Sequence, residues 1–282
     1  MIENRPFLKF IEHLVLILGV LVVAFPLWMT FVAATHDAAR MGQVPLPVLP
    51  GPHFFRNLDV VLNEGLWGGD GSGVGYMLVN SMIMALLIAF GKIVISLTSA
   101  FAIVYFRFPF RMGFFWLIFI TLMLPVEVRI LPTYEVVAKL GMLDNYWGLT
   151  VPLIASATAT FMFRQVFLTI PDELLEAARI DGAGPFRFFK DILVPMSRTN
   201  IAALFVILFI YGWNQYLWPL LVTTDQSMYT IVMQIGRMLE GAEEAPQWHL
   251  IMMTALLSVI PPVLVVLFMQ KLFVQGLTET EK

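Results

Sequence analysis

Cysteine is absent from the 282 residues of the chain, and charged side chains make up only 13% of them. The missing cysteines exclude disulfides, thiol catalysis and metal sites of the cysteine type. The net charge of −3, without any basic patch, gives no reason to expect nucleic acid as a partner. The four histidines are scattered and none lies at metal-ligand spacing from another, so the sequence predicts no metal site.

Hydrophobic residues account for 59% of the chain, and its mean hydropathy is +0.82. A soluble domain normally carries about 25% charged residues, so much of this chain requires the bilayer as its solvent. The apolar runs are continuous rather than alternating, which excludes barrel strands. Six of them reach the roughly 20 residues that a helix needs to cross a bilayer: Leu14–Val32, Leu78–Val104, Phe114–Leu131, Trp147–Phe167, Ile201–Val222 and Leu250–Phe273. The predicted fold is an all-α integral membrane protein with six transmembrane helices.

The first span has features of a signal peptide, and two spans contain proline. Arg5 and Lys9 precede the first span, and Val32-Ala33-Ala34 resembles a signal-peptide cleavage site. The stretch is longer than the apolar region of a signal peptide, which favours a retained helix. Pro125 falls within the third span and the Pro261-Pro262 pair within the sixth, and each should kink its helix because proline lacks a backbone donor.

The basic residues indicate an orientation. With a cytoplasmic N-terminus, eleven Lys and Arg side chains lie on the inner side and five on the outer side, with Lys92 inside a span. This bias follows the positive-inside rule and places both termini in the cytoplasm. Four tryptophans fall near the outer ends of spans, as expected of an interfacial belt: Trp28, Trp147, Trp218 and Trp248.

Two connections are long. The outer one, about Ala33–Met77, holds several prolines and a glycine run at 68–75 that fits neither GxGxxG nor a P-loop, so it is interpreted as a flexible loop. We therefore divide the chain into an N-terminal helix with its periplasmic loop, residues 1–77, and a core of residues 78–282. The other long connection is cytoplasmic and covers Leu168–Asn200.

The prolines, glycines and acidic residues of this cytoplasmic connection predict two short helices. Pro171 suits a first helical residue, and Asp172 and Glu173 place negative charge in the first turn. Gly182 or Gly184 can end that helix with a positive φ, and Pro185 can begin the next one. Pro195 should stop the second helix before the fifth span. An ordinary amphipathic surface element is the alternative, but Ala177 and Ala178 are small where a membrane-lying helix carries large apolar groups.

The same segment resembles a family motif. Glu176-Ala177-Ala178, then Gly182, then Ile192 and Val194-Pro195 match the EAA loop of ABC importer permeases, with Val194 in place of the usual leucine. The resemblance implies a type I importer permease fold whose EAA loop, at 169–195, docks on a separate ATPase. The docking residues it implies are Glu176, Ala177, Ala178, Asp181, Gly182, Ile192 and Pro195.

The resemblance also implies partners and location. They are a second homologous permease, a homodimeric ATP-binding subunit and a periplasmic solute-binding protein, in the bacterial inner membrane. The chain has no P-loop, so ATP and Mg²⁺ would bind to the ATPase and no cofactor to this chain. The docking role of Glu176 has an alternative, an exposed glutamate without a specific contact.

Other stretches narrow the resemblance. The run 212–219, Gly-Trp-Asn-Gln-Tyr-Leu-Trp-Pro, is similar to sugar permeases of the maltose class. The segments 1–6, 124–129 and 276–282 resemble the permeases of sn-glycerol-3-phosphate importers. The implied cargo is sn-glycerol 3-phosphate, with glycerophosphodiesters beside it, and a neutral sugar or oligosaccharide is the alternative.

Polar residues in or near the spans are the candidates for a substrate path. Lys92 costs about 2.5–3.5 kcal/mol at a helix centre, so it should face the bundle interior or water. Arg129 at the outer end of the third span either receives an anionic substrate or anchors the helix at the interface. Asn80, Asn214 and Gln215 either line the cavity or hydrogen-bond between helices, and packing is favoured for the last two.

Three other classes of protein compete on hydropathy alone. An ion-coupled secondary transporter would usually carry buried carboxylates, whereas those of this chain lie nearly all in loops. A membrane enzyme would need convergent catalytic groups, and the sequence contains neither HExxH nor GxSxG. A six-span channel is the remaining alternative on hydropathy alone.

Overall fold

The computed structural model describes residues 6–64, 73–121, 124, 126–240 and 246–278. Throughout these residues the regular structure is helical, which confirms the predicted all-α class. Contacts divide the chain into two compact units. The first joins Met1–Tyr76 to Ile235–Ile260, and the second joins Met77–Gln234 to Pro261–Lys282.

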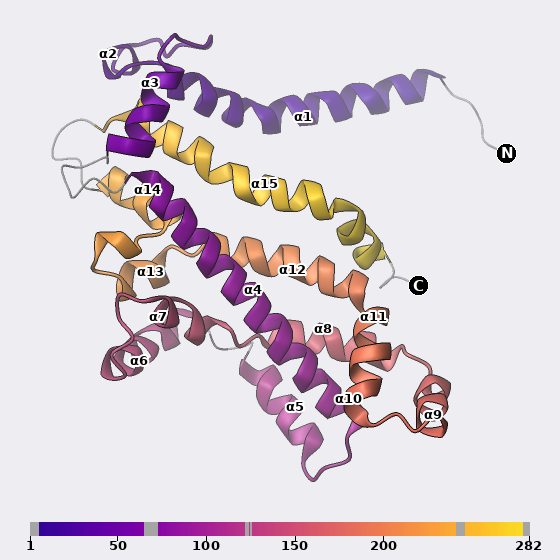
Figure 1. The fold of residues 1–282 in the computed structure, drawn as a ribbon. Coiled ribbons are helices and arrows are strands. Elements are labelled where there is room, and N and C mark those ends of the chain that lie inside the picture. The colour runs from indigo at the N-terminus through magenta and orange to yellow at the C-terminus, as the bar shows by residue number, and fades with distance from the viewer. Residues whose placement is uncertain (1–5, 65–72, 122–123, 125, 241–245, 279–282) are drawn as a thin grey trace. The chain divides into compact units, whose positions relative to one another are not determined.

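The first unit is built on α1, the long indigo helix of Figure 1. Its helices are α1 (Pro6–Ala34), α2 (Ala38–Met41), α3 (Phe54–Asp59) and the π-helical η1 (Val60–Glu64), with parts of α14 (Ile231–Glu240) and α15 (Trp248–Thr278). Large side chains of α1 such as Val15, Leu16 and Val22 are exposed along its length. Apolar surface on every side of one helix is typical of a lipid-facing span.

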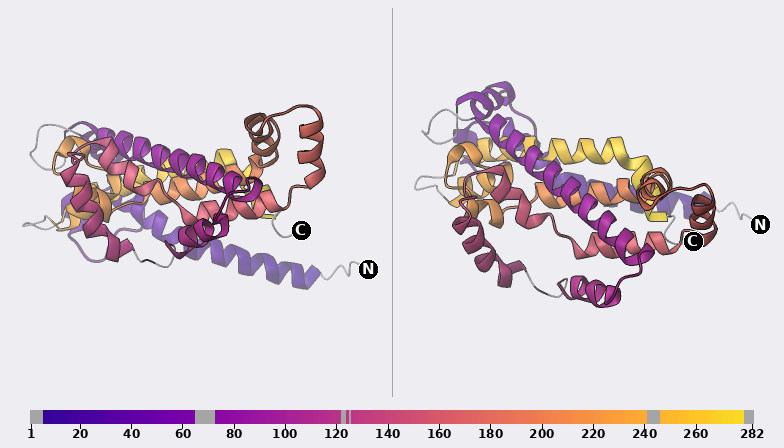
Figure 2. Two further views of the ribbon diagram at one scale, coloured as in Figure 1. Left: turned by 90° about the horizontal axis from the view of Figure 1, so that it is seen from below. Right: turned by 60° about the horizontal axis from the view of Figure 1, so that its bottom comes forward.

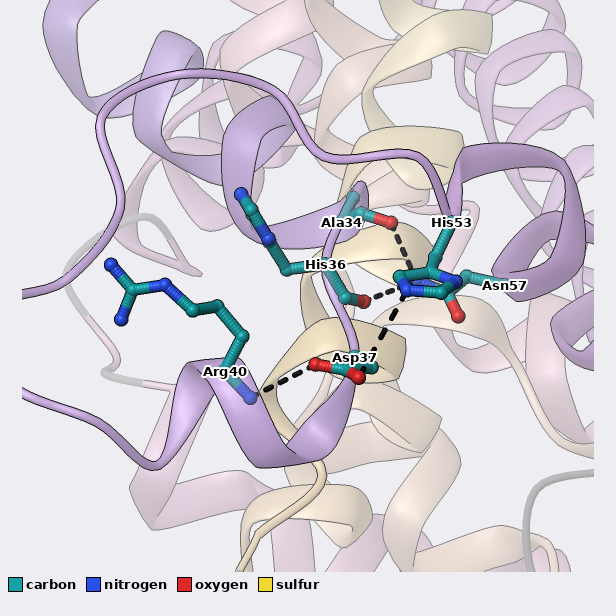
Figure 3. Close-up of polar contacts among 6 residues, drawn as sticks. All are labelled: Ala34, His36, Asp37, Arg40, His53 and Asn57. Atoms are coloured by element: carbon teal, nitrogen blue, oxygen red, sulfur yellow. Dashed lines mark hydrogen bonds and ion pairs between the residues drawn. The ribbon is translucent and has the colours of Figure 1, made fainter.

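The connection after α1 is more ordered than the sequence indicated, because the described part contains α2 and α3 (Figure 1). Figure 3 shows the polar contacts among its residues. The Asn57 amide donates to the carbonyl oxygens of Ala34, at 2.8 Å, and His36, at 2.7 Å. The backbone N–H of Arg40 donates to Asp37, which begins α2, and lowers the pKa of that carboxyl below its ordinary value. These local side-chain bonds replace the expected loop, although residues 68–72 of the glycine run lie outside the described residues.

The second unit contains the remaining helices. They are α4 (Val74–Tyr105), α5 (Arg111–Ile120), α6 (Val126–Lys139), α7 (Tyr146–Thr150), the 3₁₀ turn η3 (Val151–Leu153), α8 (Ala157–Leu168), α9 (Asp172–Ile180), α10 (Pro185–Phe188), the π-helical η4 (Phe189–Leu193), α11 (Val194–Met196), α12 (Arg198–Trp213), α13 (Leu217–Val222) and the 3₁₀ turn η5 (Gln226–Met228). Figures 1 and 2 show α9 to α11 at the end of the unit where α4 and α8 finish, with α6, α7 and α13 at the other end.

Within the described residues, three helices are long and apolar enough to cross a membrane, and they confirm the first, second and sixth predicted spans. Their apolar stretches are Lys9–Ala34, Val74–Tyr105 and Trp248–Lys271. The number rises to five if each of two bent helix pairs is one span. α15 runs on through Pro261 and Pro262.

Three predicted spans are wrong as single helices. Within Trp147–Phe167, η3 ends at Leu153 and α8 begins at Ala157, at an angle of 50°. Within Phe114–Leu131, α5 ends at Ile120 and α6 begins at Val126, because Pro125 disfavours helix at Leu124 and Leu124 is not helical. Pro125 itself lies outside the described residues, so its predicted kink does too. Within Ile201–Val222, α12 ends before Asn214 and α13 begins at Leu217. Pro219 lacks the N–H that a continuous helix would bond to residue 215.

The core of the second unit joins α4, α6, α7 and α13. It holds Met84, Ile88, Val137 and Leu149 together with Trp218. The Trp218 side chain is only 4% exposed and its indole N–H donates to the Gly148 carbonyl at 3.1 Å. Trp218 is therefore a core residue, and its assignment to an interfacial belt is wrong. Its hydrogen bond explains how the indole is buried without an unsatisfied donor.

The Asp144 carboxylate links two loops at one end of this core. Asp144 accepts hydrogen bonds from the N–H groups of Thr224, at 2.5 Å, and Asp225, at 2.8 Å, and from the Thr224 hydroxyl at 2.7 Å. Partial burial acts in the opposite direction, but these donors lower the pKa of Asp144 below its ordinary value. The ionised carboxylate thus ties the turn after α6 to the segment after α13.

Candidate functional site

A cavity of about 530 Å³ in the second unit brings together two of the predicted path residues, Lys92 and Arg129. The polar groups around it come from α4, α6, α8 and α12, from the residue after α5 and from the residue before α8. They are Lys92, Ser99, Thr121, Arg129, Ser156, Thr158, Thr160 and Tyr211. The remainder of the lining is aliphatic, from residues such as Ile95, Leu117 and Ile118. The cavity is thus apolar-walled, with two cations and several hydroxyl groups.

Lys92 lies in α4 and is 6% exposed, as the prediction of an inward-facing lysine requires. Its ammonium sits over the ring of Tyr211 on α12, 3.7 Å from the ring centroid. Among the described side chains no carboxylate forms an ion pair with it. A cation–π contact contributes only about 0.5–2 kcal/mol, so the Tyr211 ring offsets only part of the cost of burying this positive charge.

The three amide candidates lie elsewhere. Asn80 is buried; its amide group donates to the carbonyl oxygens of Ser227, at 2.7 Å, and Tyr229, at 3.1 Å, and it accepts from the Tyr146 hydroxyl at 2.6 Å. Asn80 therefore ties α4 to α7 and to the 227–229 segment. Gln215 donates to the Tyr211 carbonyl one turn back at the end of α12, at 3.0 Å, so this bond does not join two helices. Asn214 is exposed at the end of α12.

The predicted coupling segment folds as α9, a turn and α10. Gly182 has φ +70°, and its N–H donates to the Arg179 carbonyl at 3.1 Å. The next N–H, that of Ala183, donates to the Ala178 carbonyl at 2.8 Å. The two bonds form a Schellman motif, whose left-handed position favours glycine. Of the two glycines considered, Gly182 has the positive φ, whereas Gly184 has φ −71° and precedes Pro185, which begins α10 as predicted.

Two boundaries of this segment differ from prediction by a residue or two. Pro171 is not the first helical residue but caps α9 with φ −60° and ψ 137°, because an extended residue must precede the helix that starts at Asp172. Pro195 lies inside α11, and the chain turns by 73° after Met196 rather than at the proline.

The turn presents an apolar and acidic surface. Ile180 is 85% exposed and Phe186 is 75% exposed, one on each side of Gly182. Glu176, Ala177 and Asp181 are exposed on α9 and at its end, and Pro195 is exposed on α11. Ala178 is buried and Ile192 is half-buried, so these two side chains support the turn from inside. Exposed large apolar side chains next to small ones suit a protein contact.

Aromatic side chains attach this segment to the end of α4. Tyr105 packs against Phe188 at 5.2 Å between ring centroids, and Phe101 packs against Phe189 at 4.9 Å. The Tyr105 hydroxyl donates to the Phe167 carbonyl at the end of α8 at 3.2 Å. Lys92 lies thirteen residues before Tyr105 on the same helix, about 20 Å away. One rigid helix therefore joins the coupling segment to the cavity.

Sequence reasoning missed the cavity-facing role of Tyr211 and the position of Arg164. The Arg164 guanidinium lies 4.5 Å from the Phe115 ring centroid, and its buried Nε has no hydrogen-bond partner among the described residues. In the sequence, Tyr211 is only an aromatic residue in an apolar run and Arg164 only a cation in or near one, so neither stands out. Over the described part of the chain, no group of three His, Cys, Asp or Glu residues is placed to hold a metal.

Comparisons with known proteins agree with this arrangement. Residues 92–279 match the family described as binding-protein-dependent transport system inner membrane component. The sn-glycerol-3-phosphate transport system permease protein UgpE of Agrobacterium fabrum is 60% identical over 282 residues, and that of Brucella melitensis is 60% identical over 286. The protein of this name from Yersinia enterocolitica is 58% identical over 282 residues. Each similarity covers 100% of this chain and 100% of the relative.

Solved structures show the same fold. A crystal structure of a bacterial ABC transporter involved in the import of the acidic polysaccharide alginate gives a TM-score of 0.81 at 18% identity. The similarity covers 96% of this chain and 98% of the other. With the family match, the chain belongs to the binding-protein-dependent transport system inner membrane components, and it is a multi-pass permease subunit of an ABC transporter rather than an enzyme.

Proposed function

We propose that this chain is the permease subunit through which sn-glycerol 3-phosphate crosses the bacterial inner membrane, driven by ATP hydrolysis on a separate subunit. The observation that carries the proposal is the 60% identity, over the full length of both chains, to permeases named for this substrate. The cavity supplies a physical reason, since it contains two positive charges that a neutral sugar would not need.

The substrate and the cavity fit in charge and size. The phosphate of sn-glycerol 3-phosphate carries about −1.5 to −2 charges near neutral pH. An isolated anion is costly to move through a low-dielectric path, so it requires cations or donors on the way. Arg129 offers a planar fork of donors and Lys92 a compact charge. The volume of about 530 Å³ is within the roughly 300–1,000 Å³ of ordinary ligand pockets. Glycerophosphodiesters, with one negative charge, would use the same path.

The coupling segment is proposed to dock on the ATPase. Glu176, Ala177, Ile180 and Phe186 form the exposed surface, and the Gly182 turn fixes its shape. ATP binding and hydrolysis then shift the equilibrium between inward-open and outward-open states. The movement reaches the cavity through Tyr105, Phe101 and α4. ATP and Mg²⁺ would be held by a homodimeric ATPase, and a second permease and a periplasmic solute-binding protein complete the proposed complex.

We infer six membrane crossings with both termini in the cytoplasm. The third crossing would combine α5 with the residues that follow it, and the fourth and fifth would be the broken helices around α8 and α12. The Lys and Arg distribution and the likeness to the alginate transporter subunit, at a TM-score of 0.81, support this topology.

The absence of native cysteine gives a direct test of the orientation. Gly184→Cys, on the exposed coupling turn, should react with an impermeant thiol reagent only after the inner membrane face is opened. Val44→Cys, in the connection after α1, should react in cells in which only the outer membrane has been made permeable. The unsubstituted chain is the control because it contains no thiol. The reverse labelling pattern contradicts the orientation and the coupling assignment.

Uptake by the purified four-part system tests the function itself. Proteoliposomes that contain this chain, the second permease and the ATPase should accumulate radiolabelled sn-glycerol 3-phosphate when the binding protein and ATP are supplied on their proper sides. Glycerol without the phosphate should not compete with it. Uptake of a neutral sugar in place of the phosphate ester would contradict the proposed substrate.

A further inference from the structure

The chain is broken just before α8, and the break borders the cavity. η3 ends at Leu153, α8 begins at Ala157, and the two helical stretches meet at an angle of 50°. Ala155, Ser156, Ala157 and Thr158 all line the cavity. The N-terminus of the twelve-residue helix α8 therefore opens onto the space that Lys92 and Arg129 share.

The first turn of α8 has donors to spare. The Ser156 hydroxyl accepts from the Ala159 N–H at 3.3 Å, and the Ser156 carbonyl accepts from the Thr160 N–H at 3.1 Å. The N–H groups of Ala157 and Thr158 have no acceptor among the described residues. Such N–H groups carry the positive end of the helix dipole and suit an anion.

α4 is held close to this turn. A Cβ at Gly91 would lie 2.6 Å from Cγ2 of Ile154, so only glycine permits the observed approach of α4 to the break. The Ser96 hydroxyl donates to the Ser156 carbonyl at 3.3 Å. Lys92 directly follows Gly91, and its side chain, more than nine-tenths buried, lines the same cavity. The packing at Gly91 thus places the buried ammonium and the helix end around one space.

A local structural role explains only part of this arrangement. A capping serine would satisfy α8 without a buried lysine nearby, and a lysine that only filled space would be replaced by an apolar residue at lower desolvation cost. Two cations and a positive helix end around one cavity repel one another. An anion in the cavity relieves that repulsion.

We propose that the N-terminus of α8 is a third element of the substrate path, and that it binds the phosphate of a phosphomonoester together with Lys92. The N–H groups of Ala157 and Thr158 would donate to phosphate oxygens, the ammonium would move from the Tyr211 ring to the phosphate, and Arg129 would serve the cavity mouth. This inference rests on the proposed function, since it takes the phosphate ester as the cargo.

A pair of substitutions at Thr158 separates electrostatics from packing. Thr158 is exposed to the cavity at the second position of α8. Thr158→Asp places a carboxylate where the phosphate should bind, although an acidic residue there favours the helix. We expect about a tenfold or larger fall in uptake of sn-glycerol 3-phosphate, without a fall in the melting temperature of the complex. Thr158→Asn, of matched size and neutral, should retain uptake within about threefold.

A second pair tests the backbone donors. Ala157→Pro removes one N–H at the helix position that accepts proline best, and Ser156 before it is already extended at φ −147° and ψ 105°. Uptake should fall severalfold in Ala157→Pro and stay near wild type in Ala157→Ser, which keeps the N–H.

The outcomes are distinct. Equal uptake by Thr158→Asp and Thr158→Asn, or an equal loss in both, overturns the anion site. Failure of the unsubstituted complex to take up sn-glycerol 3-phosphate overturns the proposed function instead.

Discussion

Gly182→Val is expected to uncouple the transporter, with at least a fivefold fall in substrate-stimulated ATP hydrolysis and in uptake. Gly182 has φ +70°, in the left-handed region. An L-residue there costs roughly 1–2 kcal/mol, and a β-branched one more. That energy lowers the population of the docking turn, relative to other backbone conformations, by a factor of about 5–30. The reason is the backbone alone, because a Cβ at Gly182 would meet no atom within 4 Å.

The chain supplies two matched controls for this substitution. Gly184 lies two residues away, is equally open and has φ −71° with ψ 168°, so Gly184→Val should leave coupling within about twofold of wild type. Gly182→Asn should lose less activity than Gly182→Val, because asparagine tolerates the left-handed region. ATP hydrolysis by the assembled complex, with and without the loaded binding protein, measures all three. Equal activity of Gly182→Val and Gly184→Val would remove the positive φ from the coupling mechanism.

The sequence predicted the coupling turn well because its determinants are local. Proline, glycine and the first-turn acids specify the ends of α9 and the start of α10 within a few residues. A positive φ at the end of α9 was also predictable, and only the choice between Gly182 and Gly184 needed the structure. The Schellman bonds then settle that choice, since they require the left-handed residue to follow Asp181 directly.

Breaks within apolar runs were less predictable. Hydropathy reports how much of a segment prefers lipid, not whether its backbone is one helix. Pro219 lies in a run that was interpreted as a single span, and its missing N–H coincides with the gap between α12 and α13. The break before α8 contains Ile154, Ala155 and Ser156, and Pro152 lies two residues before it, although the run was interpreted as a single span. It depends on packing against Gly91 and Ser96, which are far away in sequence.

The sequence also predicted some residues of the candidate site and not others. The cost of a buried charge was enough to single out Lys92, and its inward position is confirmed. Whether a buried amide binds substrate or another helix depends on its neighbours, and Asn80 has all of its partners within the fold. Tyr211 carried no sequence signal, because an aromatic residue in an apolar helix is usually a packing residue.

Lys92→Met should raise the stability of the permease while it lowers transport. Methionine fills a similar space, and its insertion avoids the roughly 2.5–3.5 kcal/mol that a lysine costs near a helix centre. The ammonium has only the Tyr211 ring as a partner among the described residues, so little native interaction is lost. Residues kept at a cost in stability are typical of functional sites. Thermal unfolding of the purified complex tests the first half of this prediction.

The loss of transport follows from the charge on the substrate. A hydrogen bond to a charged group contributes about 1.5–3 kcal/mol, so removing one from the phosphate path should slow uptake about 10- to 100-fold. Arg129→Gln, at the same cavity, should also lower uptake, but by less, because the Arg129 side chain is exposed and water screens its charge. Ile118→Met changes the lining without changing the charge and should retain uptake near wild type. Lys92→Arg keeps the charge and should recover part of the activity lost in Lys92→Met. If Lys92→Met and Arg129→Gln both take up sn-glycerol 3-phosphate at the wild-type rate, the cations of this cavity do not compensate the phosphate, and selectivity belongs to the partner subunits.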